Sequence, residues 1–314
     1  MKLSFVIPCY NSEKTIKKVV ERIIQTVNTR PNYDYEIICV NDYSKDDTLL
    51  KLKELTENNK RIKAISLSRN FGQHGALMAG FHYVSGDVVV CLDDDGQNAP
   101  EDMFLLIDKL EEGYDLVSAK YEKDKRSFIR RIGSHFSFLM SQKLIGMPKG
   151  IELNSYYVFR GYIVNEVLKY DNSYPFVHGL ILRVTRSMAN VTLTRFEREE
   201  GHSGYNLKKL LALWMNGFIG FSEIPLRFVS FFGIAFAGVG FIGGIVVVIR
   251  KIIHPEIALG YSSTMAAMLF LFGLMMLFMG LLGEYVGRIY ISINNAPQFV
   301  VKEKINIDEK DTDS

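Results

Sequence analysis

The first 120 residues alternate between short apolar runs and amphipathic helical stretches, with polar turns between them. The expected strands are Leu3–Ile7, Glu36–Val40, Ile62–Leu67, Val88–Leu92 and Asp115–Ala119, and the expected helices are Ile16–Val27, Thr48–Leu55, Gln73–Val84 and Pro100–Leu110. Strands that alternate with helices across short turns are typical of a mostly parallel sheet with helices on both faces. The alternation therefore predicts an α/β fold.

Four polar turns follow the first four strands: Pro8–Asn11, Asn41–Ser44, Arg69–Gly72 and Asp93–Gln97. The carboxyl ends of parallel strands meet at one edge of a sheet, where open α/β sheets bind ligands. We expect these turns to converge there. Four converging turns indicate a site for a nucleotide and a metal more strongly than any one of the motifs does alone.

The turn after the fourth strand carries three carboxylates in a row. Side chains alternate along an extended chain, so we expect Asp93 and Asp95 to share one face and Asp94 to point away from it. Two adjacent carboxylates repel each other unless a cation lies between them, and hard oxygen ligands suit Mg²⁺ or Mn²⁺. Taken alone, the stretch is equally compatible with a solvated acidic loop.

Composition excludes several classes of function. The chain has 314 residues and a formal net charge of +2, so nothing indicates a nucleic-acid partner. Its three cysteines show neither metal spacing nor an even-numbered disulfide framework, which favours buried, reduced thiols. The first apolar run is too short for a signal peptide, so the N-terminal part is expected in the cytoplasm.

From residue 123 the sequence changes character. A basic cluster that includes Arg130 and Arg131 precedes an apolar stretch, and Lys208–Phe221 forms a second amphipathic pattern. Basic amphipathic helices are typical of membrane surfaces, although an ordinary surface helix packed on the core is the alternative. Between them we expect a short helix near Ile163–Leu168 and a strand at Val191–Phe196.

Two long uncharged runs lie near the C-terminus. Phe228–Ile249 and Met265–Gly283 are each long enough to cross a hydrocarbon core of ~30 Å at ~1.5 Å per residue. Basic residues flank the outer ends of this pair, which predicts a membrane hairpin with both termini in the cytoplasm. Pro297–Ser314 is expected to be a disordered, charged tail.

These features divide the chain into four parts. They are the α/β core with the predicted nucleotide and metal site (1–122), a region with amphipathic interface helices (123–227), two transmembrane helices (228–288, about 228–249 and 265–286) and a cytoplasmic tail (289–314). The predicted location is therefore the inner, or plasma, membrane, with two spans and a cytoplasmic α/β core.

A set of motifs occurs in order along the chain, and the whole set resembles one family. The motifs are Val6–Asn11, Val40–Thr48, Arg69–Gly72, Asp93–Gln97 and, after the second span, Leu282–Arg288. Together they resemble the family-two glycosyltransferases of the GT-A fold. The two spans make the chain similar to the polyprenyl-phosphate glycosyltransferases, such as the bactoprenol glucosyltransferases and dolichol-phosphate mannose synthase.

The resemblance implies transfer of one sugar from a nucleotide diphosphate sugar, most often a uridine one, to polyprenyl (undecaprenyl) phosphate. It implies a metal-dependent, inverting reaction at the cytoplasmic face of the membrane. The implied partners are the nucleotide sugar, the lipid phosphate and the membrane, and a second copy of the chain and a flippase are further candidates.

The resemblance also assigns roles to residues. The metal on the diphosphate would be bound by Asp93, Asp95 and Gln97, and Asp93 and Asp95 would be the catalytic pair. The nucleotide-binding positions would be Pro8, Tyr10, Asn11, Glu13, Asp42, Arg69 and Asp94. The donor or acceptor phosphates would be bound by Arg130, Arg131, Arg198 and Ser203.

Three residues depart from the family pattern. Tyr43 replaces the glycine of the usual Asp-Gly-Ser turn, Asn98 stands where an acid or histidine is common, and Ser155 stands where many relatives have an aspartate. That aspartate is a proposed general base. The acceptor would be a phosphate monoester, whose second pKa of ~6 makes it largely an anion at pH 7. The reaction can therefore tolerate the loss of this general base.

Two other functions remain open at this point. One is a catalytically silent membrane scaffold for a flippase or another transferase, which the intact Asp93, Asp95 and Gln97 disfavour. The other is a processive polysaccharide synthase, for which the chain is short and has few spans. Such synthases use a Gln-x-x-Arg-Trp motif, whereas Trp214, the single tryptophan of this chain, lies in the sequence Leu213-Trp214-Met215-Asn216.

Overall fold

The computed structural model describes residues 1–121, 147–148, 150–173, 175–194, 260–293 and 297–307, and short pieces between 229 and 254. The chain divides into two compact units. One consists of Met1–Tyr205 with Asn295–Ser314, and the other of Asn206–Asn294.

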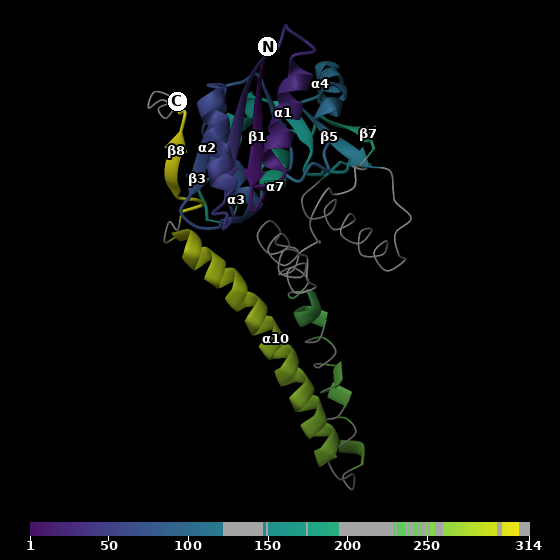
Figure 1. Ribbon diagram of the computed structural model, residues 1–314. Helices are drawn as coiled ribbons and strands as arrows, with labels where there is room; N and C mark the ends of the chain where they lie inside the picture. Colours follow the sequence, from purple (N-terminus) through teal and green to yellow (C-terminus); the bar gives the residue numbers. More distant parts are fainter. Residues whose placement is uncertain are drawn as a thin grey trace. The chain divides into compact units, whose positions relative to one another are not determined.

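The first unit is built on one sheet, which has eight strands within the described residues (Figure 1). In chain order the strands are β1 (Lys2–Cys9), β2 (Asp34–Asn41), β3 (Ile62–Leu67), β4 (Val88–Cys91), β5 (Leu116–Tyr121), β6 (Tyr157–Arg160), β7 (Met188–Leu193) and β8 (Val301–Ile305). Their order across the sheet is β7-β5-β6-β4-β1-β2-β3-β8. Only β6 and β8 run antiparallel to their neighbours, so the sheet is mostly parallel, as predicted.

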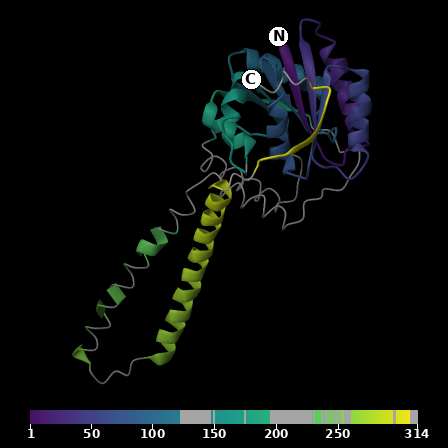
Figure 2. The same cartoon turned by 90° about the vertical axis from the view of Figure 1, so that its left-hand side faces the viewer.

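Helices cover both faces of this sheet (Figure 2). They are α1 (Ile16–Val27), α2 (Thr48–Asn58), α3 (Gly72–Phe81), the 3₁₀ turn η1 (Pro100–Asp102), α4 (Met103–Glu111), α6 (Tyr162–Val167) and α7 (Val177–Val184). One face carries α1, α2 and α4, and the other carries α3, α6 and α7. The predicted α/β architecture is therefore confirmed.

The alternation of side chains along β1 explains why both faces are covered. Leu3, Phe5 and Ile7 are buried in the core beneath α1 and α4. On the other face a Cβ on Gly80 of α3 would lie 2.5 Å from Val6 Cγ1, so only glycine lets this helix approach the sheet so closely. A strand buried on both faces requires a continuous apolar run, which is what the sequence shows.

The sheet extends beyond residue 122, the expected end of the core. Strand β6 inserts between β4 and β5, and β7 adds outside β5. The predicted strand at Val191–Phe196 begins earlier, at Met188. Its polar residue Asn190 fits inside the strand because its Nδ2 donates to the carbonyl oxygens of Ser118 (2.9 Å) and Glu152 (2.7 Å).

The expectation of a disordered C-terminal tail is wrong for residues 297–307. Val301–Ile305 forms β8, which pairs antiparallel with β3 and is an edge strand of the sheet (Figure 1). Before β8, the Ser68 N–H donates to the Val300 carbonyl (2.9 Å). Glu303 pairs with Lys53 of α2 at 2.6 Å. The charged residues of this segment are compatible with a strand, because an edge strand with one solvated face accommodates them.

In the described part of the second unit, α10 (Tyr261–Ile293) is longer than the predicted span of 265–286. Within the described residues, Phe270–Gly287 is the one segment long and apolar enough to cross a membrane, and none of its residues is buried. Large apolar side chains exposed along a whole helix are unstable in water, so lipid is their natural surrounding. The other predicted span, 228–249, lies largely outside the described residues.

Removing β8 is expected to destabilise the first unit. A chain truncated after Pro297 loses the β3 pairing and the Lys53–Glu303 ion pair, so its melting temperature in detergent should fall by several degrees. The matched control ends at Ile307 and keeps all of β8. Equal melting temperatures for the two truncations would contradict the role of β8.

A buried carboxylate stabilises the opposite, amino-terminal end of the strands. Glu36 of β2 accepts hydrogen bonds from Ser4 Oγ and from the Ser85 backbone N–H, and it pairs with Lys2 and Lys63. Burial by itself would raise the pKa of Glu36. These hydrogen bonds and positive charges outweigh it, so the pKa is lowered.

Replacing this carboxylate should weaken folding in a pH-dependent way. We expect Glu36→Gln to cost about 2–3 kcal/mol at pH 7, because it leaves two lysines without their buried partner. Since the folded pKa is lowered, the stabilisation exists above the ordinary pKa of glutamate, about 4.3, and disappears as the pH falls through the folded value. Thermal unfolding from pH 7 to pH 3 measures this. A difference that stays constant with pH would contradict it.

Candidate functional site

Four polar turns form the candidate site at the carboxyl edge of the sheet. They follow β4, β1, β2 and β3, which are consecutive neighbours in the sheet. Neighbouring strands lie ~4.8 Å apart, so the four turns are brought side by side. The predicted convergence therefore follows from the observed strand order.

The acidic turn is not an extension of its strand. Strand β4 ends at Cys91, and the chain turns at Gly96, whose φ of +75° is favourable only for glycine. Asp95 Oδ1 accepts a hydrogen bond from the Gln97 N–H (3.0 Å), and Asp93 Oδ1 accepts one from Gln73 Nε2 of α3 (2.9 Å). The expected strand alternation thus stops before the carboxylates, and turn geometry decides where each one points.

Asp94 connects the acidic turn to the loop after β1. Its Oδ2 accepts a hydrogen bond from the Tyr10 backbone N–H at 3.0 Å. Burial raises the pKa of Asp94 to about 6; the Tyr10 N–H opposes this shift, and repulsion from Asp93 and Asp95 adds to it. This mutual repulsion is what a bound cation would relieve.

Asp93, Asp95 and Gln97 offer oxygen donors of the kind that Mg²⁺ and Mn²⁺ prefer. Among the described residues, no group of three or more His, Cys, Asp or Glu side chains is arranged to hold a metal ion. Mg²⁺ commonly takes only one or two protein carboxylates and completes its shell with substrate phosphates and water. The residues at the turn fit that type of site, in which the substrate supplies further ligands.

The loops after β1 and β2 are joined by a series of hydrogen bonds. The Asn11 N–H donates to Ser44 Oγ (3.0 Å), and Asn11 Oδ1 accepts from the Lys45 N–H (2.9 Å). Further along, Glu13 Oε2 accepts from the Asp47 N–H at 2.9 Å, just before α2. Two of the predicted nucleotide-binding side chains therefore also hold the two loops together.

Asp42 ties the loop after β2 to the loop after β3. Its buried carboxylate accepts hydrogen bonds from the backbone N–H groups of Phe71 (2.7 Å) and Gly72 (2.8 Å) at the start of α3. Burial raises the pKa of Asp42, and the two N–H groups oppose the rise. Arg69 is exposed at the same edge, and its guanidinium lies 4.7 Å from the centre of the Phe71 ring.

The sequence did not single out Gln73 as the partner of Asp93. No local signal could have done so, because the two residues are 20 positions apart and meet only when α3 packs on the sheet. The next residue, His74, is half-buried, and desolvation lowers its pKa to about 4. It is therefore neutral at pH 7 and cannot act as a cationic phosphate ligand.

The structure places the three residues that depart from the family pattern in different surroundings. Tyr43 has a left-handed backbone, with a φ of +59°. Asn98 is buried, and its Oδ1 accepts a hydrogen bond from Tyr121 Oη at 2.6 Å. Asn154, next to Ser155, donates from Nδ2 to the Ala119 carbonyl of β5 at 2.7 Å. The left-handed region is one that glycine enters freely, so a glycine would fit the backbone at position 43.

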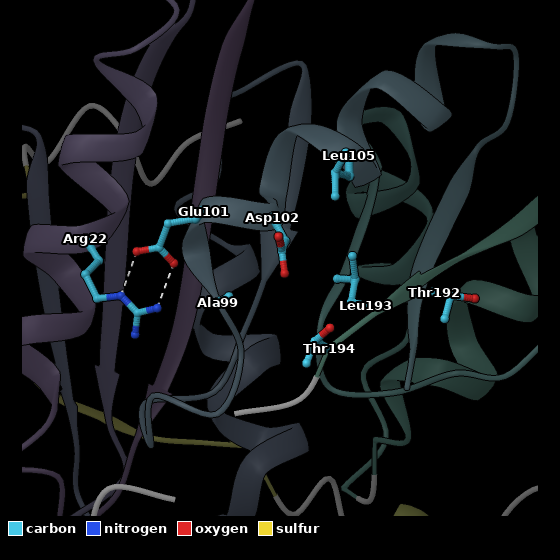
Figure 3. Close-up of a pocket in the computed structure, with 8 residues that line it drawn as sticks. All are labelled: Arg22, Ala99, Glu101, Asp102, Leu105, Thr192, Leu193 and Thr194. Carbon is cyan, nitrogen blue, oxygen red and sulfur yellow. Dashed lines mark hydrogen bonds and ion pairs between the residues drawn. The ribbon is translucent and has the colours of Figure 1, made fainter. Parts of the chain in front are cut away.

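A separate cavity of about 510 Å³ lies beside the site, between α1, η1, α4 and β7 (Figure 3). Arg22 pairs with Glu101 through two hydrogen bonds of 2.8 and 2.7 Å, and Asp102 adds a second carboxylate to the wall. None of the predicted site residues lines this cavity. Among the described lining residues one arginine faces two carboxylates, so this part of the wall is negative and does not favour phosphate groups.

Four predicted phosphate-binding residues lie outside the described part of the chain: Arg130, Arg131, Arg198 and Ser203. The remaining predicted residues lie on the described turns, and Pro8 is the penultimate residue of β1.

Comparison with known proteins identifies the family and a similar fold. Residues 4–165 match the family described as "Glycosyl transferase family 2", and residues 224–289 match the "GtrB C-terminal hairpin". The fold resembles glucosyl-3-phosphoglycerate synthase from Mycobacterium tuberculosis, solved with Mn²⁺ and UDP-glucose. The TM-score is 0.50 at 22% identity, over 67% of this chain and 74% of that one.

Two relatives match over 98% of this chain and 95% of their own length. "Uncharacterized glycosyltransferase YkcC" of Bacillus subtilis is 32% identical over 309 residues. "Undecaprenyl-phosphate 4-deoxy-4-formamido-L-arabinose transferase" of Yersinia enterocolitica is 35% identical over 313 residues. The hairpin match covers both predicted spans and indicates association with a membrane. By its sequence, its fold and its carboxylate-lined sheet edge, the chain belongs to glycosyltransferase family 2.

Proposed function

We propose that this glycosyltransferase moves a single sugar from a nucleotide diphosphate sugar, UDP-linked, to undecaprenyl phosphate. The observation that carries the proposal is the acidic turn, which hydrogen bonds join to the loops of neighbouring strands at one sheet edge. A relative that is 35% identical over 98% of the chain and is named for an undecaprenyl-phosphate acceptor supports the choice of acceptor.

In this proposal Asp93, Asp95 and Gln97 hold Mg²⁺ or Mn²⁺ against the diphosphate of the donor. The bound ion would neutralise the charge that develops on the leaving diphosphate. The chain's own part is to keep both carboxylates in place, which the hydrogen bonds from Gln73 and from the Gln97 N–H support. The nucleotide would then extend from the acidic turn along Pro8–Asn11, Glu13, Asp42 and Arg69.

The acceptor is a phosphate monoester, which is already largely an anion at pH 7. It can attack the anomeric carbon in a single displacement with inversion, without a strong general base and without a covalent enzyme intermediate. The main requirement of the reaction is then to align the two anions, which are the acceptor phosphate and the donor diphosphate. Arginine suits it because its forked donors match phosphate oxygens, and Arg130, Arg131 and Arg198 are proposed for this task, with Ser203. Asp95 is further proposed to orient the acceptor.

The enzyme must bind the phosphate of a lipid acceptor close to the surface of the bilayer. The exposed apolar surface of α10 and the hairpin match over residues 224–289 support a membrane-bound enzyme. Basic residues at the outer ends of the hairpin support a plasma-membrane protein with its catalytic unit and both termini in the cytoplasm. Self-association through the hairpin and a flippase that moves the product across the membrane complete the proposal.

The reaction can be tested with the purified full chain in detergent. We would incubate it with undecaprenyl phosphate, Mg²⁺ or Mn²⁺ and a panel of nucleotide sugars, and identify the lipid product by mass spectrometry. The expected result is one lipid-linked sugar from one preferred donor. No product from any donor would contradict the proposal and favour a catalytically silent scaffold.

Asp93→Asn should lower the rate of transfer about 100-fold or more, because the variant loses a metal-binding charge. The amide oxygen can still accept the hydrogen bond from Gln73, so the fold is preserved. Asp108→Asn is the matched control: Asp108 is exposed on α4 and pairs with Arg30, away from the acidic turn. Wild-type rates for Asp93→Asn would show that the metal assignment is wrong.

Removing divalent cations with EDTA should abolish transfer, and added Mg²⁺ or Mn²⁺ should restore it, because the leaving diphosphate has no other proposed counter-charge at the acidic turn. Product formation is measured before and after the metal is restored. Full activity in EDTA would argue that protein side chains alone neutralise the diphosphate.

A further inference from the structure

Tyr43 has a backbone conformation that its side chain disfavours. Its φ of +59° lies in the left-handed region, which glycine and asparagine enter far more readily than a bulky residue. Asn11, in the facing loop, has a φ of +53°, but it belongs to a residue type that tolerates this conformation. Strain of this kind gathers at functional sites, where the side chain contributes something that glycine could not.

The ring of Tyr43 lies outside the buried core. It is 47% exposed, and Tyr10 in the facing loop is 48% exposed. Within the described part of the chain, neither phenol ring has a hydrogen bond, ion pair or ring contact. Two large aromatic side chains are thus presented to solvent at the same edge of the sheet.

The backbone that carries these rings is well supported. Each tyrosine immediately precedes one member of a hydrogen-bonded pair, Asn11 N–H to Ser44 Oγ at 3.0 Å. A second hydrogen bond, Lys45 N–H to Asn11 Oδ1 at 2.9 Å, closes the connection. The two rings are therefore held on adjoining loops, which keeps the entropic cost of ordering them around a flat ligand small.

The distance of Tyr10 and Tyr43 from the acidic turn suits the base of a nucleotide. Tyr10 is attached to Asp94 by its backbone N–H, and Tyr43 lies one strand further away, in the order β4-β1-β2. Two strand spacings correspond to roughly 10 Å. With the diphosphate at the acidic turn, the base would reach the loops of β1 and β2.

We infer that Tyr43 is a nucleobase-binding residue, which together with Tyr10 provides an aromatic surface for the base of the donor. The inference rests on the proposed function and adds to it a residue that determines affinity for the base. The strained backbone at Tyr43 is then retained because its ring contacts the ligand. Glycine, the residue usual at this turn, would relieve the strain and lose the contact.

The test measures binding of UDP and of inorganic pyrophosphate to the full chain in detergent with Mg²⁺ or Mn²⁺, by calorimetry. Tyr43→Ala and Tyr43→Gly should raise the Kd for UDP roughly 5- to 20-fold, in the lower range for base–aromatic stacking. Tyr43→Phe keeps the ring and should bind UDP as the wild type does. Pyrophosphate has no base, so its Kd should be the same for all four proteins.

Tyr162→Ala is the matched control. Tyr162 is 51% exposed, and it follows the antiparallel strand β6, so it lies at the opposite edge of the sheet. This variant should leave the Kd for UDP unchanged. Tyr43→Gly should leave the melting temperature unchanged or raise it, because it removes the strain, so weaker binding could not be attributed to unfolding.

Two results would overturn the inference alone: a wild-type Kd for UDP in Tyr43→Ala, or an equal loss of UDP and pyrophosphate binding, which would indicate a displaced loop. A wild-type chain that binds none of UDP, CDP, ADP and GDP would overturn the proposed function and this inference with it. The titration of the wild-type chain therefore distinguishes failure of this inference from failure of the proposed function.

Discussion

The parallel alignment of β4, β1, β2 and β3 is the constraint on which the rest of the site depends. Because these strands run the same way and are neighbours, the chain must leave all four of them at the same edge. The apolar residues of β1 are buried on both faces, so the register cannot slip without exposing them. Packing of the core therefore decides where the polar turns lie, although none of the turn residues contributes much to that core.

Carboxylates have two tasks at this edge. Asp94, Asp42 and Glu13 accept hydrogen bonds from backbone N–H groups of other loops, and these bonds build the site before any ligand binds. Asp93 and Asp95 present the oxygen donors that we propose for a cation. A site assembled in this way loses little entropy or reorganisation energy when its substrate arrives, which is the condition for effective electrostatic catalysis.

Much of this was predictable, for identifiable reasons. The strands Ile62–Leu67 and Val88–Cys91 are apolar runs bounded by turn residues, and helix Ile16–Val27 has a clear helical period, so local pattern was sufficient. The prediction of a disordered tail was wrong at Val301–Ile305, because pairing with β3 depends on a contact between distant parts of the chain. The left-handed backbone at Tyr43 has no local signal in the sequence, because the hydrogen bond between Asn11 and Ser44 that supports it joins two separate loops.

The sequence by itself determined the α/β class, the shared edge for the four turns, the membership in a glycosyltransferase family and the residues available for a metal. Hydrophobic period and motif order carry that information locally. Only the tertiary structure decided which carboxylates bind backbone groups, that Gln73 meets Asp93, and that Tyr10 and Tyr43 remain exposed on joined loops. Those outcomes depend on pairs such as Tyr10 and Asp94, 84 residues apart, whose contact exists only after the whole sheet has formed.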